Sequence, residues 1–214
     1  MLLYFMEKNG IDVAVRQWYT EDKKTKEEAI VMSFMDMVYK RESCRSYQDK
    51  PVSRELLTKI AEAGRLAPSG CNAQPWKFIV IDEPEAKKKM CEALVVEGGA
   101  TGCPWRESAP AFIALVEEHA NVMPAVLDYY GDSQRFAQGD IGMAAMNMMY
   151  EAEDLGLGTC VLGLSDQKKM EESFGIPEGH TVRMVLAVGY SAESKEPRKK
   201  VRKPLEEVCS FNQW

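Results

Sequence analysis

The sequence predicts one domain in which helices and strands are mixed along the chain. The chain has 214 residues, of which 45% are hydrophobic, and this is enough to bury a core without disulfides or metals. Three short apolar segments have the length and composition of buried strands, and segments with helical periodicity separate them. The strand candidates are residues 76–81, 111–116 and 182–190.

Composition and charge argue against several classes of function. The formal net charge of −6 disfavours nucleic-acid binding, which needs a basic face. The apolar run at residues 1–6 is far shorter than the roughly 20 residues of a membrane span. The six cysteines form no Cys-x-x-Cys pair and the two histidines form no ligand pattern, so we expect no metal site. Without a secretory signal pattern, we expect a cytoplasmic protein with reduced thiols.

The first 34 residues contain no chemical motif. They are predicted to form an N-terminal extension, either a helical arm or an accessory segment, and residues 35–214 are predicted to form the main domain. A mostly buried helix is expected across residues 29–40, with Phe34, Met37 and Val38 on one stripe.

Arg41, Ser43 and Arg45 alternate directly after this helix. If the helix continues, the two arginines lie four residues apart on one face, and if it ends, alternate residues of an extended segment point the same way. Either geometry directs two guanidinium groups and a hydroxyl at one spot, which suits a phosphate or an anionic ring edge. The alternative is a solvated helix end, where the helix dipole favours cations.

Residues 67–80 (APSGCNAQPWKFIV) combine turn residues, two side-chain amides and the start of a strand. Pro68 fixes its own φ and Gly70 permits a positive φ, so the backbone can approach a ligand closely. Asn72 and Gln74 each offer donors and an acceptor, which suits the edge of a heterocycle. The alternative is an ordinary connection between a helix and a strand.

The rest of the chain adds further helices and a short strand. Gly156 and Gly158 do not form a dinucleotide-binding fingerprint, because they follow a helix and Val161 breaks the glycine spacing. The long helix is rich in small residues and methionines, so we expect it at a subunit interface. The predicted helices are residues 53–66, 84–96, 134–155 and 166–174, and the short strand is residues 159–162.

A second cationic cluster lies near the C-terminus of this acidic chain. Lys200 and Arg202 alternate there, just before the sequence KPLEEV. A charged run is usually solvated, but this alternation also suits a second contribution to an anion site.

Four segments resemble, in the same order, the nitroreductase-like family of FMN-dependent oxidoreductases. They are RESCR, PSGCNAQPW, LGLGTCVLG and KVRKPLEEV, and they extend roughly from Met35 to Val208. The resemblance implies an α+β fold with a mixed, largely antiparallel sheet flanked by helices. It also implies an intertwined homodimer with FMN bound at each subunit interface.

The same resemblance implies which residues bind the cofactor. Arg41, Ser43 and Arg45 are expected to contact the phosphate and flavin ring; Pro68, Ser69, Gly70 and Asn72, with Gln74 beside them, to contact the flavin of the partner subunit; Leu162 and Gly163 to meet the reactive ring edge through their backbone; and Lys200 and Arg202 to complete the phosphate site. Glu42 beside this site is unfavourable unless its side chain points away. Cys71, where small or hydroxyl residues are common in the family, is expected to fill space.

The implied activity is hydride transfer from NAD(P)H through FMN to an electron-poor acceptor, nitroaromatic or quinone-like, in a ping-pong cycle. The cofactor carries this chemistry, so no catalytic side chain is expected. Arg45 is expected to stabilise negative charge on the reduced ring. Two alternatives stay open: a different flavin enzyme on the same fold, such as a dehalogenase, and a non-enzymatic FMN-binding dimer.

Overall fold

The computed structural model of this chain describes residues 33–193 and 197–214. The predicted N-terminal extension therefore lies almost wholly outside the described residues. Met35–Trp214 forms one compact unit, which mixes helices with a single sheet. The α+β fold class that the sequence predicts is confirmed.

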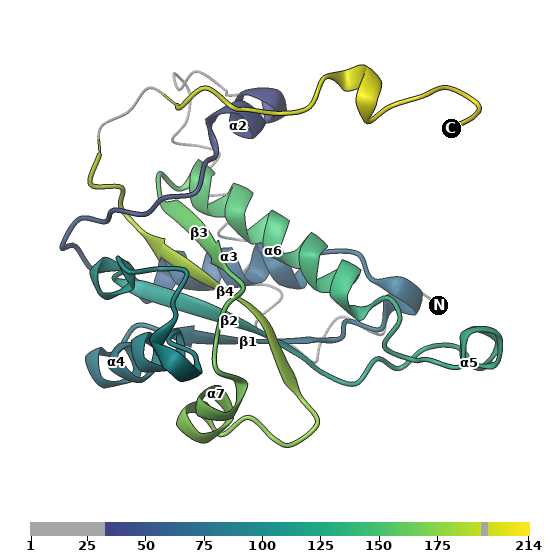
Figure 1. The fold of residues 1–214 in the computed structure, drawn as a ribbon, viewed down its shortest axis with the longest axis horizontal. Helices are drawn as coiled ribbons and strands as arrows, with labels where there is room; N and C mark the ends of the chain where they lie inside the picture. Colours follow the sequence, from purple (N-terminus) through teal and green to yellow (C-terminus); the bar gives the residue numbers. More distant parts are fainter. Residues whose placement is uncertain (1–32, 194–196) are drawn as a thin grey trace, which may run out of the picture. The chain divides into compact units, whose positions relative to one another are not determined.

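A four-stranded sheet lies at the centre of this unit, with the strand order β1-β2-β4-β3 (Figure 1). Every neighbouring pair of strands is antiparallel, so the largely antiparallel sheet is also confirmed. All four apolar segments predicted as strands are strands of this sheet. Their bounds are Trp76–Ile81 for β1, Ala111–Glu117 for β2, Gly158–Leu162 for β3 and Thr181–Gly189 for β4.

Two pairs of helices enclose the sheet, with one pair on each face (Figure 1). α3 and α6 share a buried core with one face, and α4 and α7 share a second core with the other. The bounds are Arg54–Arg65 for α3, Pro84–Ala93 for α4, Ala137–Asp154 for α6 and Gln167–Phe174 for α7.

Strand β2 shows why a continuous apolar run becomes the middle of such a sheet. Successive side chains of a strand point to opposite faces. Phe112 and Ala114 accordingly belong to the core under α4 and α7, whereas Ile113 and Leu115 belong to the core under α3 and α6. Both faces are covered, so every residue of β2 is buried.

Helices α3 and α6 pack closely because of a glycine. Gly64 lies in the last turn of α3, and a Cβ at this position would come within 2.3 Å of the Met148 methyl group on α6. The start of α3 is fixed as predicted, since the Ser53 hydroxyl accepts a hydrogen bond from the Leu56 N–H at 3.3 Å.

Helix α2 (Phe34–Lys40) departs from the prediction of a mostly buried helix, because none of its residues is buried. Met35 and Tyr39 are each more than half exposed. An apolar stripe shows which side of a helix needs a partner, but it does not show that the partner belongs to the same chain. The prediction of burial is therefore wrong for the described part of this helix.

The last residue of β2 carries a buried carboxylate. Glu117 is 6% exposed, and it accepts hydrogen bonds from Arg183 on β4 and from Gln134 Nε2, the latter at 2.9 Å. Burial raises the pKa of Glu117, but the hydrogen bonds from Arg183 and Gln134 outweigh burial and hold the pKa below its usual value.

We expect Glu117 to make stability depend on pH. Because its pKa is lower in the folded state, its stabilising contribution is present above the unfolded-state pKa of about 4.3 and is lost as the pH falls through the folded value. Glu117→Gln should therefore lower the free energy of unfolding at pH 7 and flatten its decline in acid. Urea unfolding at a series of pH values measures both. The exposed Glu172 supplies the control, Glu172→Gln, and parallel pH profiles for wild type and Glu117→Gln would contradict the assignment.

Candidate functional site

The residues that follow α2 are extended and lie along the outer edge of β3. Ser43 forms a parallel bridge with Thr159, and the Cys44 N–H donates to the Thr159 carbonyl at 2.9 Å. Since α2 ends at Lys40, the extended alternative holds for the alternating residues Arg41, Ser43 and Arg45.

The C-terminal segment, residues 197–214, lies against Arg41 and Ser43. Lys200 Nζ donates to the Arg41 carbonyl at 2.6 Å, and Arg198 donates from Nη2 to the Ser43 carbonyl at 2.9 Å. The two cationic clusters that the sequence places far apart are thus brought together. Beyond them the segment forms the short turn η4 (Leu205–Glu207).

Positive charges are concentrated at this junction. The pKa of Lys200 is lowered, first by desolvation and then by the charges of Arg41 and Arg202, while Glu42 and Glu153 act in the opposite direction. A bound anion would relieve this repulsion and favour the charged lysine. The arrangement therefore fits a phosphate or a similar anion.

Arg45 extends the positive charge along β3. Burial raises the pKa of the Cys160 thiol on this strand, and the nearby charge of Arg45 acts against that rise. Two residues further on, β3 ends at Leu162, which is buried and is followed by the exposed Gly163. Arg45 and the end of β3 therefore lie along the same edge of the sheet as the cluster of Arg41, Lys200 and Arg202.

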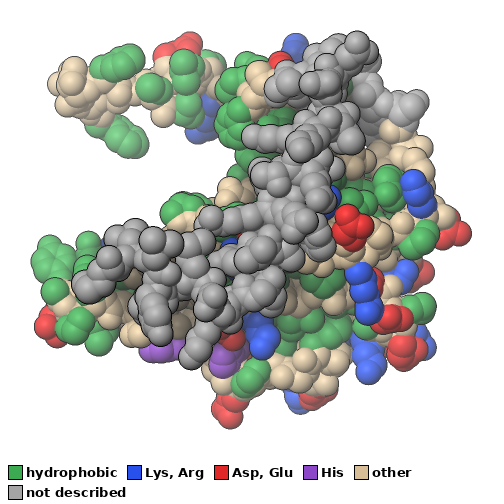
Figure 2. Space-filling model, turned by 180° about the vertical axis from the view of Figure 1, so that it is seen from behind, with side chains coloured by type: hydrophobic (Ala, Val, Ile, Leu, Met, Phe, Trp, Pro, Cys, Tyr) green, Lys and Arg blue, Asp and Glu red, His purple; other side chains and the backbone are tan. Residues whose placement is uncertain are grey.

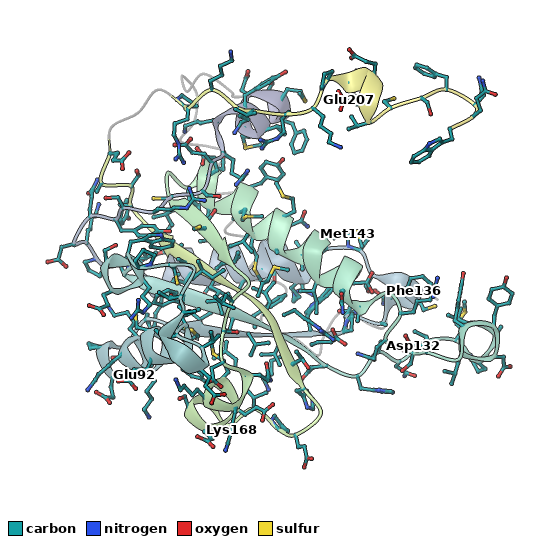
Figure 3. All side chains as sticks on the ribbon, viewed as in Figure 1. Glu92, Asp132, Phe136, Met143, Lys168 and Glu207 are labelled. Carbon is teal, nitrogen blue, oxygen red and sulfur yellow. The ribbon has the colours of Figure 1, made fainter. Side chains whose placement is uncertain are left out.

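The predicted residues from Pro68 to Gln74 lie elsewhere, at the start of α6. The Gly70 N–H donates to both carboxylate oxygens of Asp140, at 3.2 Å and 3.1 Å. A Cβ at Gly70 would lie 3.3 Å from the Phe136 side chain, which Figure 3 shows just before α6. Gly70 is thus needed for close packing. It does not adopt the positive φ that the sequence suggested for it.

Three other residues of this loop adopt the left-handed backbone conformation instead. Cys71, Asn72 and Gln74 have φ values of 55°, 54° and 47°. The loop is held by the Ser69 hydroxyl, which accepts from the Gln74 N–H at 2.9 Å, and by the Gln74 side chain, which donates to the Asn72 carbonyl at 3.3 Å. Such backbone strain is concentrated at ligand sites, so the loop conformation fits a binding role.

Asp140 is the residue that the sequence analysis missed. It is only 4% exposed and fixes the loop through Gly70. Its one signal in the sequence is its place as the acidic residue in the first turn of α6, next to Gly139. A carboxylate there also interacts favourably with the helix dipole.

The two groups of predicted residues lie near opposite ends of α6. The loop contacts Asp140 in the first turn, whereas Lys40, which precedes Arg41, pairs with Glu153 near the last turn at 3.2 Å. Asp140 and Glu153 are separated by thirteen positions, which correspond to roughly 20 Å of helix. One chain therefore holds the two groups of predicted residues apart, and they are called the two candidate half-sites below.

Other features of the described residues lie apart from the predicted site. A cleft of about 1030 Å³ between α4 and α7 contains none of the predicted residues. In the described part of the chain, no group of three or more His, Cys, Asp or Glu side chains could hold a metal ion. Among these same residues, no helix has the length and apolar character that crossing a membrane requires.

Comparison with known proteins identifies the family. The Nitroreductase family profile matches residues 38–190. An Archaeoglobus fulgidus protein with the provisional name NADH dehydrogenase/NAD(P)H nitroreductase is 34% identical over 166 residues, which cover 76% of this chain and 87% of that protein. An FMN reductase (NAD(P)H) of Bacillus subtilis is 31% identical over 169 residues, covering 73% and 66%. The crystal structure of a nitroreductase family protein from Clostridium difficile has a TM-score of 0.72 at 29% identity, covering 86% and 100%. The chain belongs to the nitroreductase family.

Asp140→Ala should loosen the loop at residues 68–74, because the Gly70 N–H loses its acceptor. The expected loss is about 1–3 kcal/mol in the free energy of unfolding. Hydrogen exchange of the peptide that covers the loop should also become faster. Asp140→Asn keeps one acceptor oxygen and should show a smaller effect on both measurements. Unchanged exchange in Asp140→Ala would show that the carboxylate does not hold the loop.

Proposed function

We propose that this chain is an FMN-dependent NAD(P)H oxidoreductase that acts as a homodimer. The observation that carries the proposal is the cluster of Arg41, Lys200 and Arg202 beside the edge of β3. These cations come from segments at the two ends of the domain. Their mutual repulsion favours a bound anion, and the phosphate of FMN meets this requirement.

The neighbouring residues fit the rest of the cofactor. Ser43 pairs with Thr159 of β3 and its hydroxyl contacts the Cys160 thiol, and Arg45 lies along β3 toward Leu162 and Gly163. In this arrangement Arg41, Lys200 and Arg202 would hold the phosphate, and Arg45 with the end of β3 would contact the flavin ring. The relative from Bacillus subtilis that is named an FMN reductase supports the choice of cofactor.

When bound, FMN supplies the redox chemistry, accepting a hydride from NAD(P)H and passing it to an electron-poor acceptor, nitroaromatic or quinone-like, in a ping-pong sequence. The side chains of the protein bind and orient the cofactor. Arg45 places a fixed positive charge where negative charge develops on the ring. No side chain needs to act as an acid or base, so we assign no catalytic residue.

The separation of the two half-sites supports a homodimer. The loop at residues 68–74 lies roughly 20 Å along α6 from the cations of its own chain, so the loop of a second copy would complete each site. The outer face of α6 is suited to this contact. Among the described residues, a Cβ at Gly139 or Gly142 would meet nothing within 4 Å, and the neighbouring Met143 is 41% exposed (Figure 3). Small residues let a second helix approach closely.

The C-terminal segment gives independent support for the dimer. Its apolar side chains are exposed in the single chain, and Figure 2 shows them at the upper left. Contiguous exposed apolar side chains are typical of surfaces that bind another protein. The exposed apolar side chains of this segment include Leu205, Val208, Phe211 and Trp214.

The visible absorption spectrum of the purified protein tests the proposal directly. We expect a flavin spectrum that bleaches when NADH or NADPH is added without oxygen, and the effective nucleotide identifies the donor. Colour should return when a nitroaromatic or quinone is added. A yellow protein that neither nucleotide bleaches would instead indicate a flavin-binding role without this activity. A colourless protein that takes up no added FMN would overturn the proposal.

A variant at Arg45 tests where the flavin ring binds, and the absorption spectrum again measures the FMN content. Arg45→Ala should retain less FMN on purification, because it removes a cation beside the ring. Lys168→Ala is the matched control, since Lys168 is an exposed cation on α7 (Figure 3). Equal FMN content in both variants would count against the placement of the ring at Arg45.

Met143→Glu should prevent dimer formation, because it places a charge on the outer face of α6. Light scattering after size exclusion should give about twice the chain mass of 24.1 kDa for the wild type and a single chain mass for the variant. The variant should also retain less FMN. Lys168→Glu makes a comparable change on α7 and should remain dimeric. A dimeric Met143→Glu protein with full FMN content would contradict this interface.

A further inference from the structure

A carboxylate lies in the middle of the proposed phosphate site. Glu42 stands between Arg41 and Ser43 in the sequence, where its charge would repel a phosphate. The structure pairs it with Arg198 of the C-terminal segment. Glu42 Oε2 accepts from Arg198 Nε at 2.8 Å and from the Arg198 backbone N–H at 3.3 Å.

Arg198 makes a further contact with the backbone of the same segment. Its Nη2 donates to the Ser43 carbonyl at 2.9 Å, so one guanidinium group bridges the Glu42 side chain and the Ser43 backbone. The planar fork of arginine can make both contacts at once, which a lysine ammonium on a flexible stem reproduces poorly. Two residues further on, Lys200 reaches the Arg41 carbonyl at 2.6 Å.

Glu42 also acts on the pKa of Lys200. Desolvation and the charges of Arg41 and Arg202 lower this pKa, whereas the charge of Glu42 raises it. The carboxylate is therefore close enough to act as an internal competitor for the cations of the site. The pairing with Arg198 gives this carboxylate a partner of its own. Lys200 and Arg202 donate to backbone carbonyls, so among the described residues these two cations do not share the Arg198 ion pair with Glu42.

We propose that Arg198 is a positioning residue for the cofactor phosphate. It ties the C-terminal segment to residues 42–43, and it engages the Glu42 carboxylate that would otherwise pair with Lys200 or Arg41. This inference rests on the proposed function. It predicts that loss of Arg198 weakens binding of the phosphate group of the cofactor and leaves binding of the flavin ring unchanged.

Binding of FMN and of riboflavin, which lacks the phosphate, tests the inference. The apoprotein of each variant is titrated with both flavins by fluorescence quenching. Arg198→Ala should weaken FMN binding about tenfold or more, the size of one lost charge-assisted interaction, and leave riboflavin binding unchanged. Adding Glu42→Gln to Arg198→Ala removes the competing carboxylate and should restore part of the lost FMN affinity. Arg198→Lys should fall between wild type and Arg198→Ala.

The matched control is Arg54→Ala, which removes another exposed arginine that pairs with a carboxylate, Asp82, away from both half-sites. Its FMN affinity should equal that of the wild type. Unchanged FMN affinity in Arg198→Ala would overturn the inference, and so would an equal loss for both flavins or a double variant with no recovery. A wild-type protein that binds neither flavin would overturn the proposed function, and this inference with it.

Discussion

The free edge of β3 is the constraint on which the site depends. β3 is the outer strand of the sheet, and its unpaired backbone groups need partners. The segment after α2 provides them through the bridge of Ser43 with Thr159 and the hydrogen bond from Cys44. This pairing fixes the alternating residues from Arg41 to Arg45 against a rigid sheet. The C-terminal segment then has a defined surface to lie on, because its contacts are made to the carbonyl groups of Arg41 and Ser43.

Charge is the second constraint, because the chain as a whole is acidic. Cations that gather in such a chain would normally pair with its own carboxylates, and an ion pair satisfied within the protein has less affinity for an external anion. The ion pair of Glu42 with Arg198 engages one carboxylate beside the cluster of cations. The strained loop at residues 68–74 is held in a comparable way, since the buried Asp140 carboxylate accepts a hydrogen bond from the backbone N–H of Gly70.

The sequence predicted most of the fold because apolar periodicity is a local property. The strands and the long helix could be placed from the segments that form them, and the alternation of Arg41, Ser43 and Arg45 was visible before the structure. What could not be predicted depends on distant contacts. Nothing near Asp140 indicates that it binds the Gly70 N–H, seventy residues earlier. Likewise, the apolar residues of α2 predict a buried surface, but no residue of this helix is buried. The assignment of the twelve cofactor-binding residues stays a prediction.

In the proposed homodimer, two half-sites at opposite ends of one helix would couple cofactor binding to assembly. If each cofactor is held by the cations of one chain and the loop of another, it binds the dimer more tightly than the separate chains. Mass action then requires that the cofactor stabilise the dimer by the same free energy with which the dimer strengthens cofactor binding. In the proposed dimer, the second copy would also bury the exposed apolar side chains of α2 and of the C-terminal segment. Hydrophobic burial and the completed anion site therefore favour one assembly, and a change that weakens either should weaken both.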